Sequence, residues 1–186
     1  PLVHRAPFKP PIAIPVLSIE EEKTSLNRAF LETHRAVRVR YEVARVENLN
    51  LLVVRRVRAL HYSGHGLEDC LAFESRLAEL HSVDTEVLRA LVVAEGDQGL
   101  QLAFVSACHS ENAGQSFVDA GVAHVVAVRW DVTINDRAAH VFSTNFYMSL
   151  LSGRSIIKSF ENGRAMVQAD PSIPSLDEMD KFILRP

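Results

Sequence analysis

Residues 100–128, LQLAFVSACHSENAGQSFVDAGVAHVVAV, decide the fold class. An apolar run opens this stretch and leads directly into the segment 107–110, and Asn112–Ala120 has the spacing of a short helix that ends at Gly121. Ala123–Val128 is almost entirely apolar, which is typical of a strand buried on both faces of a parallel sheet. The stretch therefore predicts a strand, a short helix and a second, parallel strand.

The same alternation of strands and helices extends in both directions. We expect a helix that begins at a capping box at Ser18, and further helices over Asn48–Val54, Asp84–Val93 (stopped by Gly96), Asp136–Leu151 and Ser155–Ala169. We also expect a half-buried strand over Val37–Tyr41, and strands over Val57–Tyr62, Leu71–Phe73 and Lys181–Leu184. This alternation predicts an α/β fold with a mainly parallel central sheet and helices on both faces. Residues 1–17 are rich in proline, which is excluded from helix interiors and central strands, and predict an extended arm.

Composition and charge narrow the classes of function. The chain has 186 residues, 47% of them apolar and 23% charged, which suits one domain with a substantial core. Its formal net charge of −3 gives no electrostatic reason to bind nucleic acid, and no apolar run approaches the ~20 residues of a membrane span. The arginines between Arg35 and Arg58 are interpreted as a solvated face, with a docking patch for an acidic partner as the alternative.

The two cysteines, Cys70 and Cys108, are too few for a disulfide framework, which favours a reducing, cytoplasmic location. Cys70 is interpreted as a packing residue. The N-terminus lacks the continuous apolar region of a signal peptide and also lacks an initiator methionine. We therefore expect residues 18–186 to form one domain within a segment cut from a larger protein.

Two loops are expected to carry the chemistry, because functional groups of parallel sheets gather beyond the carboxyl ends of the strands. One loop follows Tyr62 and contains His65, and the other follows Ser106 and contains Cys108. If the two strands are neighbours, the imidazole lies beside the thiol, lowers its pKa and accepts its proton. The backbone N–H groups of Gly66 and Cys108 would then bind an oxyanion. From spacing alone, a cysteine that merely packs at the end of a strand is the commoner alternative.

The residues around these two positions resemble the CHAT domain of the caspase-like cysteine peptidases. The resemblance rests on LHYSGHG at 60–66 and FVSACHSENAGQSFVDAGVAHVVAV at 104–128, and it continues through a pattern from Trp130 to Gly153 and the terminal KFIL at 181–184. It implies a caspase-like three-layer fold and a cysteine endopeptidase that hydrolyses protein substrates without a cofactor. By the same resemblance, Cys108 is the nucleophile and His65 its general base, whereas His61 and His109 only accompany them.

The chain departs from the pattern of related peptidases at two places. Metacaspases carry an aspartate two residues before the cysteine, where it helps to bind a basic side chain, and Ser106 stands there in this chain. A preference for arginine or lysine is therefore not supported. The family's fold also opens with a strand inside the sheet, which is either replaced by Ile12–Leu17 or lies outside this segment.

Candidate substrate-binding residues are Ser106, Trp130 and Asp131, because the corresponding loops line the substrate groove of caspase-like enzymes. An uncompensated buried carboxylate would be costly, so Asp131, like Asp69, is expected to face water. We therefore predict a pocket of mixed or apolar character. A tryptophan packed over the core is the alternative for Trp130.

The same residues allow other functions. His61, His65, Cys70, Cys108 and His109 include zinc-type ligands, but they lack the closely spaced pairs of structural zinc sites, and no metal is expected. Ser63 lacks the surroundings of a nucleophile elbow and is interpreted as a turn hydroxyl. The main rival function is a pseudo-peptidase, a CHAT fold kept as an interaction module in a larger assembly, since fold alone does not imply function. In either case, flanking domains or a regulatory partner protein are expected.

Overall fold

The computed structural model describes residues 3–4, 12–13, 16–93 and 99–186. Two short strands near the N-terminus, β1 (Val3–His4) and β2 (Ile12–Ala13), pair in the antiparallel direction. The rest of the predicted arm up to residue 15, and the predicted helix stop at Gly96, lie outside the described residues.

A four-stranded sheet forms the centre of the fold. The order of its strands is β3 (Ala59–Ser63), β7 (Leu102–Ser106), β8 (His124–Val128) and β9 (Phe182–Arg185). The first three strands are parallel, and β9 runs antiparallel to β8. Every residue of β7 is buried, as a strand with neighbours on both sides and helices on both faces requires. The predicted mainly parallel sheet is confirmed.

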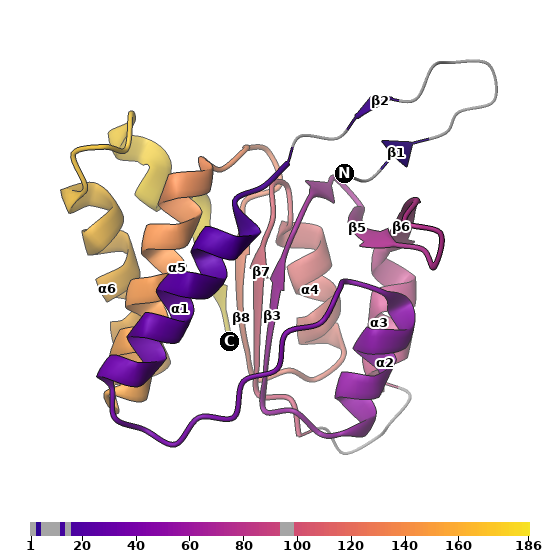
Figure 1. Cartoon of the computed structure of the whole chain (residues 1–186), viewed down its shortest axis with the longest axis horizontal. Coiled ribbons are helices and arrows are strands. Elements are labelled where there is room, and N and C mark those ends of the chain that lie inside the picture. The colour runs from indigo at the N-terminus through magenta and orange to yellow at the C-terminus, as the bar shows by residue number, and fades with distance from the viewer. Residues whose placement is uncertain (1–2, 5–11, 14–15, 94–98) are drawn as a thin grey trace.

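Helices cover both faces of this sheet (Figure 1). One layer consists of α1 (Ile19–Glu32), α5 (Asp136–Leu151) and α6 (Ile156–Ala169), and the other of α2 (Val46–Val54), α3 (Thr85–Val93) and α4 (Glu111–Asp119). Side chains of β7 alternate between the two layers, because Leu102 and Phe104 pack with the first and Ala103 and Val105 with the second. The result is the predicted three-layer α/β fold.

Two helix ends that were predicted from a following glycine are confirmed. Gly121 and Gly153 follow α4 and α5 with φ of +89° and +90°, the left-handed conformation that glycine adopts at little cost. The predicted capping box at Ser18 is wrong in one respect, since the Ser18 side chain makes no capping hydrogen bond. Instead, the Ser18 backbone N–H donates to the Asp136 carboxylate at 3.2 Å.

A small antiparallel sheet was only partly predicted. It consists of β4 (Gly66–Leu67), β5 (Cys70–Glu74) and β6 (Leu80–Asp84), and it follows β3 directly. Only β5 was expected, because β4 is too short to show a period and β6 is largely exposed and polar. A short 3-10 helix, η1 (Leu176–Lys181), also precedes β9.

The half-buried strand predicted over Val37–Tyr41 is wrong. These residues lie within residues 34–43, a connection between α1 and α2 in which every residue is exposed. Within the described part of the chain no strand pairs with this connection, so its alternating pattern has no sheet to join. The same described ranges contain no helix both long and apolar enough to cross a membrane.

Candidate active site

His65 and Cys108 occupy equivalent places at the carboxyl edge of the sheet. The parallel strands β3 and β7 are neighbours, and Ser63 lies opposite Ser106 at their ends. Each of the two candidate residues follows its serine by two positions. The Gly64 N–H donates to the Ser106 carbonyl at 3.2 Å, so the chains stay together beyond the strand ends. The expected adjacency of the two strands is confirmed, and the roles of the two residues stay predictions.

Gly66 joins the histidine loop to the cysteine turn by direct backbone contact. A Cβ atom placed on Gly66 would lie 2.1 Å from the carbonyl oxygen of Cys108 and 3.1 Å from the Cβ of Ala107. Any side chain here would therefore force the two loops apart, and only glycine permits this approach. This contact brings the backbone of residue 66 against the cysteine that was predicted to share an oxyanion hole with it.

Contacts with Ala72 and Tyr62 fix the backbone carbonyl group of His65. Its carbonyl oxygen accepts a hydrogen bond from the Ala72 N–H at 3.0 Å and lies 3.0 Å from the Tyr62 hydroxyl, which also reaches the Ala72 carbonyl at 2.7 Å. Burial raises the pKa of Tyr62 far above its ordinary value, so the hydroxyl keeps its proton and acts as a donor. His65 itself is half-buried.

The cysteine turn is fixed by Ser110, which is fully buried. Its hydroxyl donates to the Val105 carbonyl at 3.1 Å and accepts from the Val128 N–H at 2.9 Å, so it joins the turn to both β7 and β8. His109 takes a φ of 53°, a conformation uncommon outside glycine and often found at functional sites. Cys108 is a half-buried free thiol, three residues before the first residue of α4.

Asn112, in the first turn of α4, links the small sheet to the cysteine turn. Its side-chain amide donates to the Glu68 carbonyl at 3.0 Å and to the Asp69 carboxylate at 3.1 Å. Glu68 and Asp69 form the turn between β4 and β5. The prediction that Asp69 faces water is confirmed, because the residue is exposed.

The predicted substrate-binding residues differ in their exposure to solvent. Ser106 is buried at the end of β7 and Trp130 is 53% exposed, so the alternative in which Trp130 packs over the core is wrong. The Trp130 carbonyl lies 2.6 Å from Nδ1 of His109, which places its backbone beside the cysteine turn. Asp131 is exposed and forms an ion pair with Arg129 at 3.0 Å, as expected for a carboxylate that faces water.

Sequence reasoning missed Glu22 of α1, which is only 2% exposed. Its carboxylate accepts hydrogen bonds from the hydroxyls of Ser63 and of Ser143, the latter at 3.3 Å, and lies 3.3 Å from Nε2 of His61. Burial alone would raise the pKa of Glu22, but its contact and electrostatic interaction with His61 and the Ser63 hydrogen bond outweigh burial and lower the pKa to about 2. An ionised carboxylate is thus held against the end of β3.

His61 completes this buried cluster and has a place distinct from that of His65. Its ring stacks on Phe104 with the centroids 4.7 Å apart, and Nδ1 lies 3.2 Å from the Tyr147 hydroxyl. One signal for the cluster exists in the sequence: Glu22 stands four residues before Leu26 and therefore on the same helix face as a core residue.

In the described ranges, no three His, Cys, Asp or Glu side chains gather as metal ligands would. Cys70 opens β5 as a half-buried free thiol.

A mainly parallel sheet between two helical layers, with a histidine loop and a cysteine turn at adjacent strand ends, is consistent with the caspase-like class of proteins. The family model of the CHAT domain matches residues 12–175, which is most of the chain, and the chain therefore belongs to the CHAT domain family. No curated protein matches it.

Proposed function

We propose that this chain is a cysteine endopeptidase with Cys108 as nucleophile and His65 as general base. The observation that supports this most directly is the register of β3 and β7, which carries both residues two positions beyond a paired serine, with Gly66 against the Cys108 carbonyl. A thiol and an imidazole at adjacent strand ends are the minimal unit for nucleophilic attack on a peptide carbonyl.

The proposed reaction has two steps. The Cys108 thiol transfers its proton to His65, and the sulfur attacks the peptide carbonyl carbon, while the N–H groups of Gly66 and Cys108 hold the oxyanion. The C–N bond then breaks, the leaving amine takes the proton from His65, and a thioester remains on Cys108. His65 next removes a proton from water, which attacks the thioester, releases the carboxylic acid product and returns the proton to the sulfur.

The side chain next to the cleaved bond is proposed to enter a pocket of mixed or apolar character. Ser106 offers no charge at the position two residues before the cysteine, and the carboxylate of Asp131 is already paired with Arg129. The exposed indole of Trp130 supplies an apolar wall beside the cysteine turn. We expect leucine and methionine to be accepted, and a preference for arginine by more than about tenfold, or roughly 1.4 kcal/mol, would overturn this assignment.

The test is labelling by a biotinylated peptidyl acyloxymethyl ketone, which reacts with an activated catalytic thiol. The wild-type chain and Cys70→Ala should be labelled alike, whereas Cys108→Ala and His65→Ala should lose labelling. Mass spectrometry should locate the adduct on Cys108. Absence of labelling in the wild-type chain would favour the rival function, a CHAT fold that acts only as an interaction module.

A further inference from the structure

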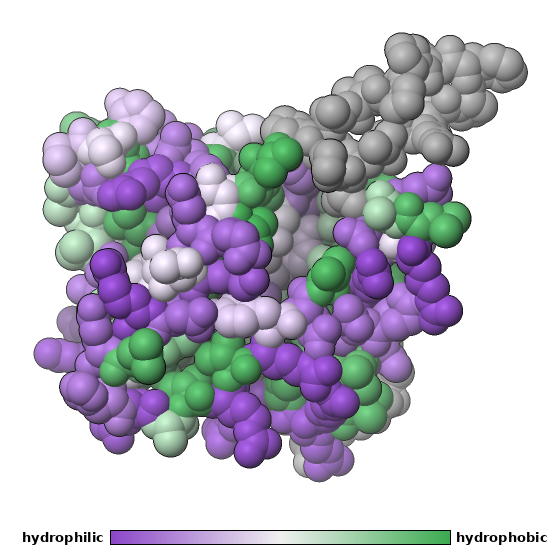
Figure 2. Space-filling view, in the orientation of Figure 1, coloured by the Kyte–Doolittle hydropathy of each residue, from purple (hydrophilic) through white to green (hydrophobic). Residues whose placement is uncertain are grey.

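Trp130 is the only tryptophan of the chain and lies in the connection that follows β8. Its side chain is 53% exposed. Exposure alone does not mark a site, since hydrophobic residues stand among hydrophilic ones on the face drawn in Figure 2. Trp130 is distinguished by its backbone, because both of its polar groups are held by side chains.

Two side chains close to the candidate nucleophile hold the backbone of Trp130. The Trp130 carbonyl oxygen lies 2.6 Å from Nδ1 of His109, and because a carbonyl oxygen can only accept, Nδ1 carries the proton of this hydrogen bond. The Trp130 N–H donates to the Glu111 carboxylate at 3.1 Å. His109 directly follows Cys108, and Glu111 is the first residue of α4. The position of Trp130 is therefore fixed relative to the cysteine turn.

Further contacts hold His109 and Glu111 themselves. The His109 N–H donates to the Val132 carbonyl at 3.3 Å, which joins the two segments a second time. The Glu111 carboxylate also forms an ion pair with Arg185, at the end of β9. His109 takes its φ of 53° at a cost in free energy, and a conformation of this kind beside a candidate nucleophile favours a functional reason.

The order of the strands places Trp130 on one side of the thiol. The order β3-β7-β8 puts the histidine loop on one side of the cysteine turn and the Trp130 connection on the other. In the proposed reaction His65 gives its proton to the leaving amine, so the amine part of the substrate lies on the β3 side. The acyl part, which stays on the cysteine as a thioester, lies on the β8 side. There the exposed indole offers an apolar face to a substrate side chain.

We propose that His109 and Glu111 are positioning residues for substrate recognition, and that they act through Trp130. By holding both polar groups of its backbone, they keep the indole where it covers a large apolar side chain in the acyl part of the substrate, the class of leucine, methionine and phenylalanine. Neither residue takes part in bond breaking. This role rests on the proposed function, although binding at Trp130 can be measured without any reaction.

The first experiment measures binding by the fluorescence of Trp130, which no other tryptophan obscures. It uses Cys108→Ala, which cannot form the thioester, and two blocked peptides of alanine and serine that carry either one leucine or one glycine at the centre. The leucine peptide should shift the emission to shorter wavelength, as an indole does when it leaves water, and should bind at least about tenfold more tightly than the glycine peptide. No shift, or equal affinity for the two peptides, would overturn the proposal.

The second experiment removes the His109 ring in the same background. His109→Gly deletes the hydrogen bond without straining the backbone, because glycine adopts a φ of 53° at little cost. It should weaken binding of the leucine peptide by at least about fivefold. His109→Asn should restore most of the affinity, because asparagine tolerates this φ and its amide nitrogen is as many bonds from the backbone as Nδ1. Equal affinities for the two variants would overturn the role of the ring.

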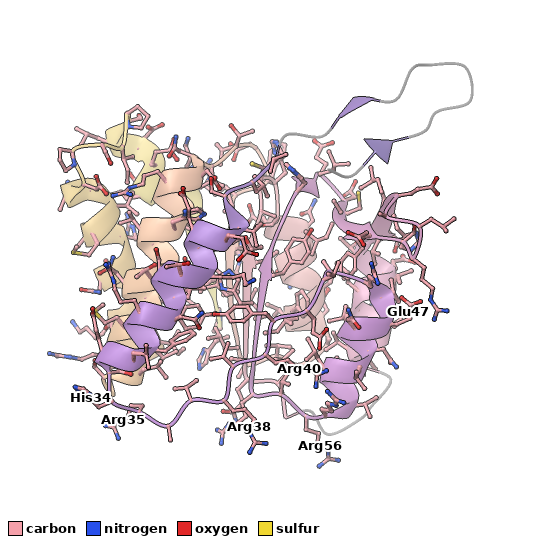
Figure 3. The ribbon with its side chains drawn as sticks, in the orientation of Figure 1. His34, Arg35, Arg38, Arg40, Glu47 and Arg56 are labelled. Atoms are coloured by element: carbon pink, nitrogen blue, oxygen red, sulfur yellow. The ribbon has the colours of Figure 1, made fainter. Side chains whose placement is uncertain are left out.

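The carboxylate is tested by Glu111→Ala, which should weaken binding of the leucine peptide to a similar extent. The matched control is Glu47→Ala. Glu47, labelled on α2 in Figure 3, also lies in the first turn of its helix and pairs with an arginine, Arg76, at 2.9 Å. The control should leave binding unchanged, and equal effects of the two substitutions would overturn the role of Glu111.

The third experiment separates recognition from reaction in the chain that retains Cys108. His109→Gly should raise the concentration of a leucine-containing peptidyl acyloxymethyl ketone that gives half-maximal labelling, and should change the maximal rate far less. A loss confined to the maximal rate would place His109 in the reaction and overturn its positioning role. Failure of the proposed function gives a different result, because no ketone would then label wild-type Cys108 while the leucine peptide still shifts the Trp130 emission.

Discussion

Two segments of this chain have sequences suited to strands, and only one of them is a strand. Leu102–Ser106 is buried at every position as β7, between β3 and β8. Residues 34–43 alternate Val, Tyr and charged residues and remain exposed, with no strand beside them among the described residues. The comparison shows that an alternating pattern makes a segment able to join a sheet, while the neighbours available decide whether it does.

The contrast extends to the candidate site. The ends of β3 and β7 are held by several independent contacts, through Gly66, Tyr62 and Glu22. Changes there should be costly, and changes in residues 34–43 should be nearly free. The predictions below test this contrast from the largest expected effect to the smallest.

Gly66→Ala should have the largest effect. The added Cβ would lie 2.1 Å from the Cys108 carbonyl oxygen, which belongs to backbone and cannot rotate away. We expect a loss of about 3 kcal/mol in the free energy of unfolding, measured by denaturant titration, together with loss of labelling at Cys108. Gly121→Ala is the control, because no atom lies within 4 Å of its added Cβ, and its φ of +89° alone should cost about 1 kcal/mol. Equal costs would show that the two loops are not in contact.

Glu22→Gln should come next and should change the response to acid. The variant keeps the shape but removes the charge beside His61, at an expected cost of about 2 kcal/mol near neutral pH. In the wild type, the folded pKa of Glu22 is about 2 and its ordinary value is 4.5. The stabilisation is therefore complete above pH 4.5 and is lost as the pH falls toward 2.

The measurement is the unfolding free energy of both proteins between neutral pH and pH 2. The two curves should converge as the pH falls, because a protonated glutamate resembles glutamine. The parallel control is Glu21→Gln, an exposed carboxylate one position earlier, whose curve should follow the wild type. A constant gap between wild type and Glu22→Gln would show that the carboxylate is not ionised in the fold.

Tyr62→Phe should have a moderate effect. Removing the hydroxyl leaves the buried Ala72 carbonyl without this donor, which should cost about 1 to 2 kcal/mol. The substitution also removes the contact of the hydroxyl with the His65 carbonyl, so labelling at Cys108 should slow as well. Tyr41→Phe is the matched control. Its exposed hydroxyl donates to the Asn27 side chain at 2.8 Å, and its loss should cost less than about 0.5 kcal/mol.

The sequence was informative where a local signal was also the structural cause. The helices could be predicted to within about two residues, because apolar spacing and terminal glycines such as Gly121 act locally. The position of the candidate site could be predicted because the carboxyl ends of neighbouring parallel strands lie at the same edge of the sheet. Glu22 could not, since it belongs to the acidic run Glu20–Glu22, which suits a helix N-terminus wherever it lies. Its burial depends on the contact of α1 with β3 and α5. The strand predicted over Val37–Tyr41 is wrong for the same kind of reason. A segment joins a sheet only if another strand lies beside it, and no local sequence pattern records that.

The smallest effect is expected from Val39→Thr in the exposed segment. The Val39 side chain is 39% exposed, so the new hydroxyl can reach water, and the unfolding free energy should change by less than about 0.5 kcal/mol. The same substitution at Val105, which is 1% exposed in β7, buries a hydroxyl in an apolar layer and should cost about 2 kcal/mol. Denaturant titrations of the two variants measure this difference directly. If Val39→Thr cost as much as Val105→Thr, residues 34–43 would be packed like a sheet strand.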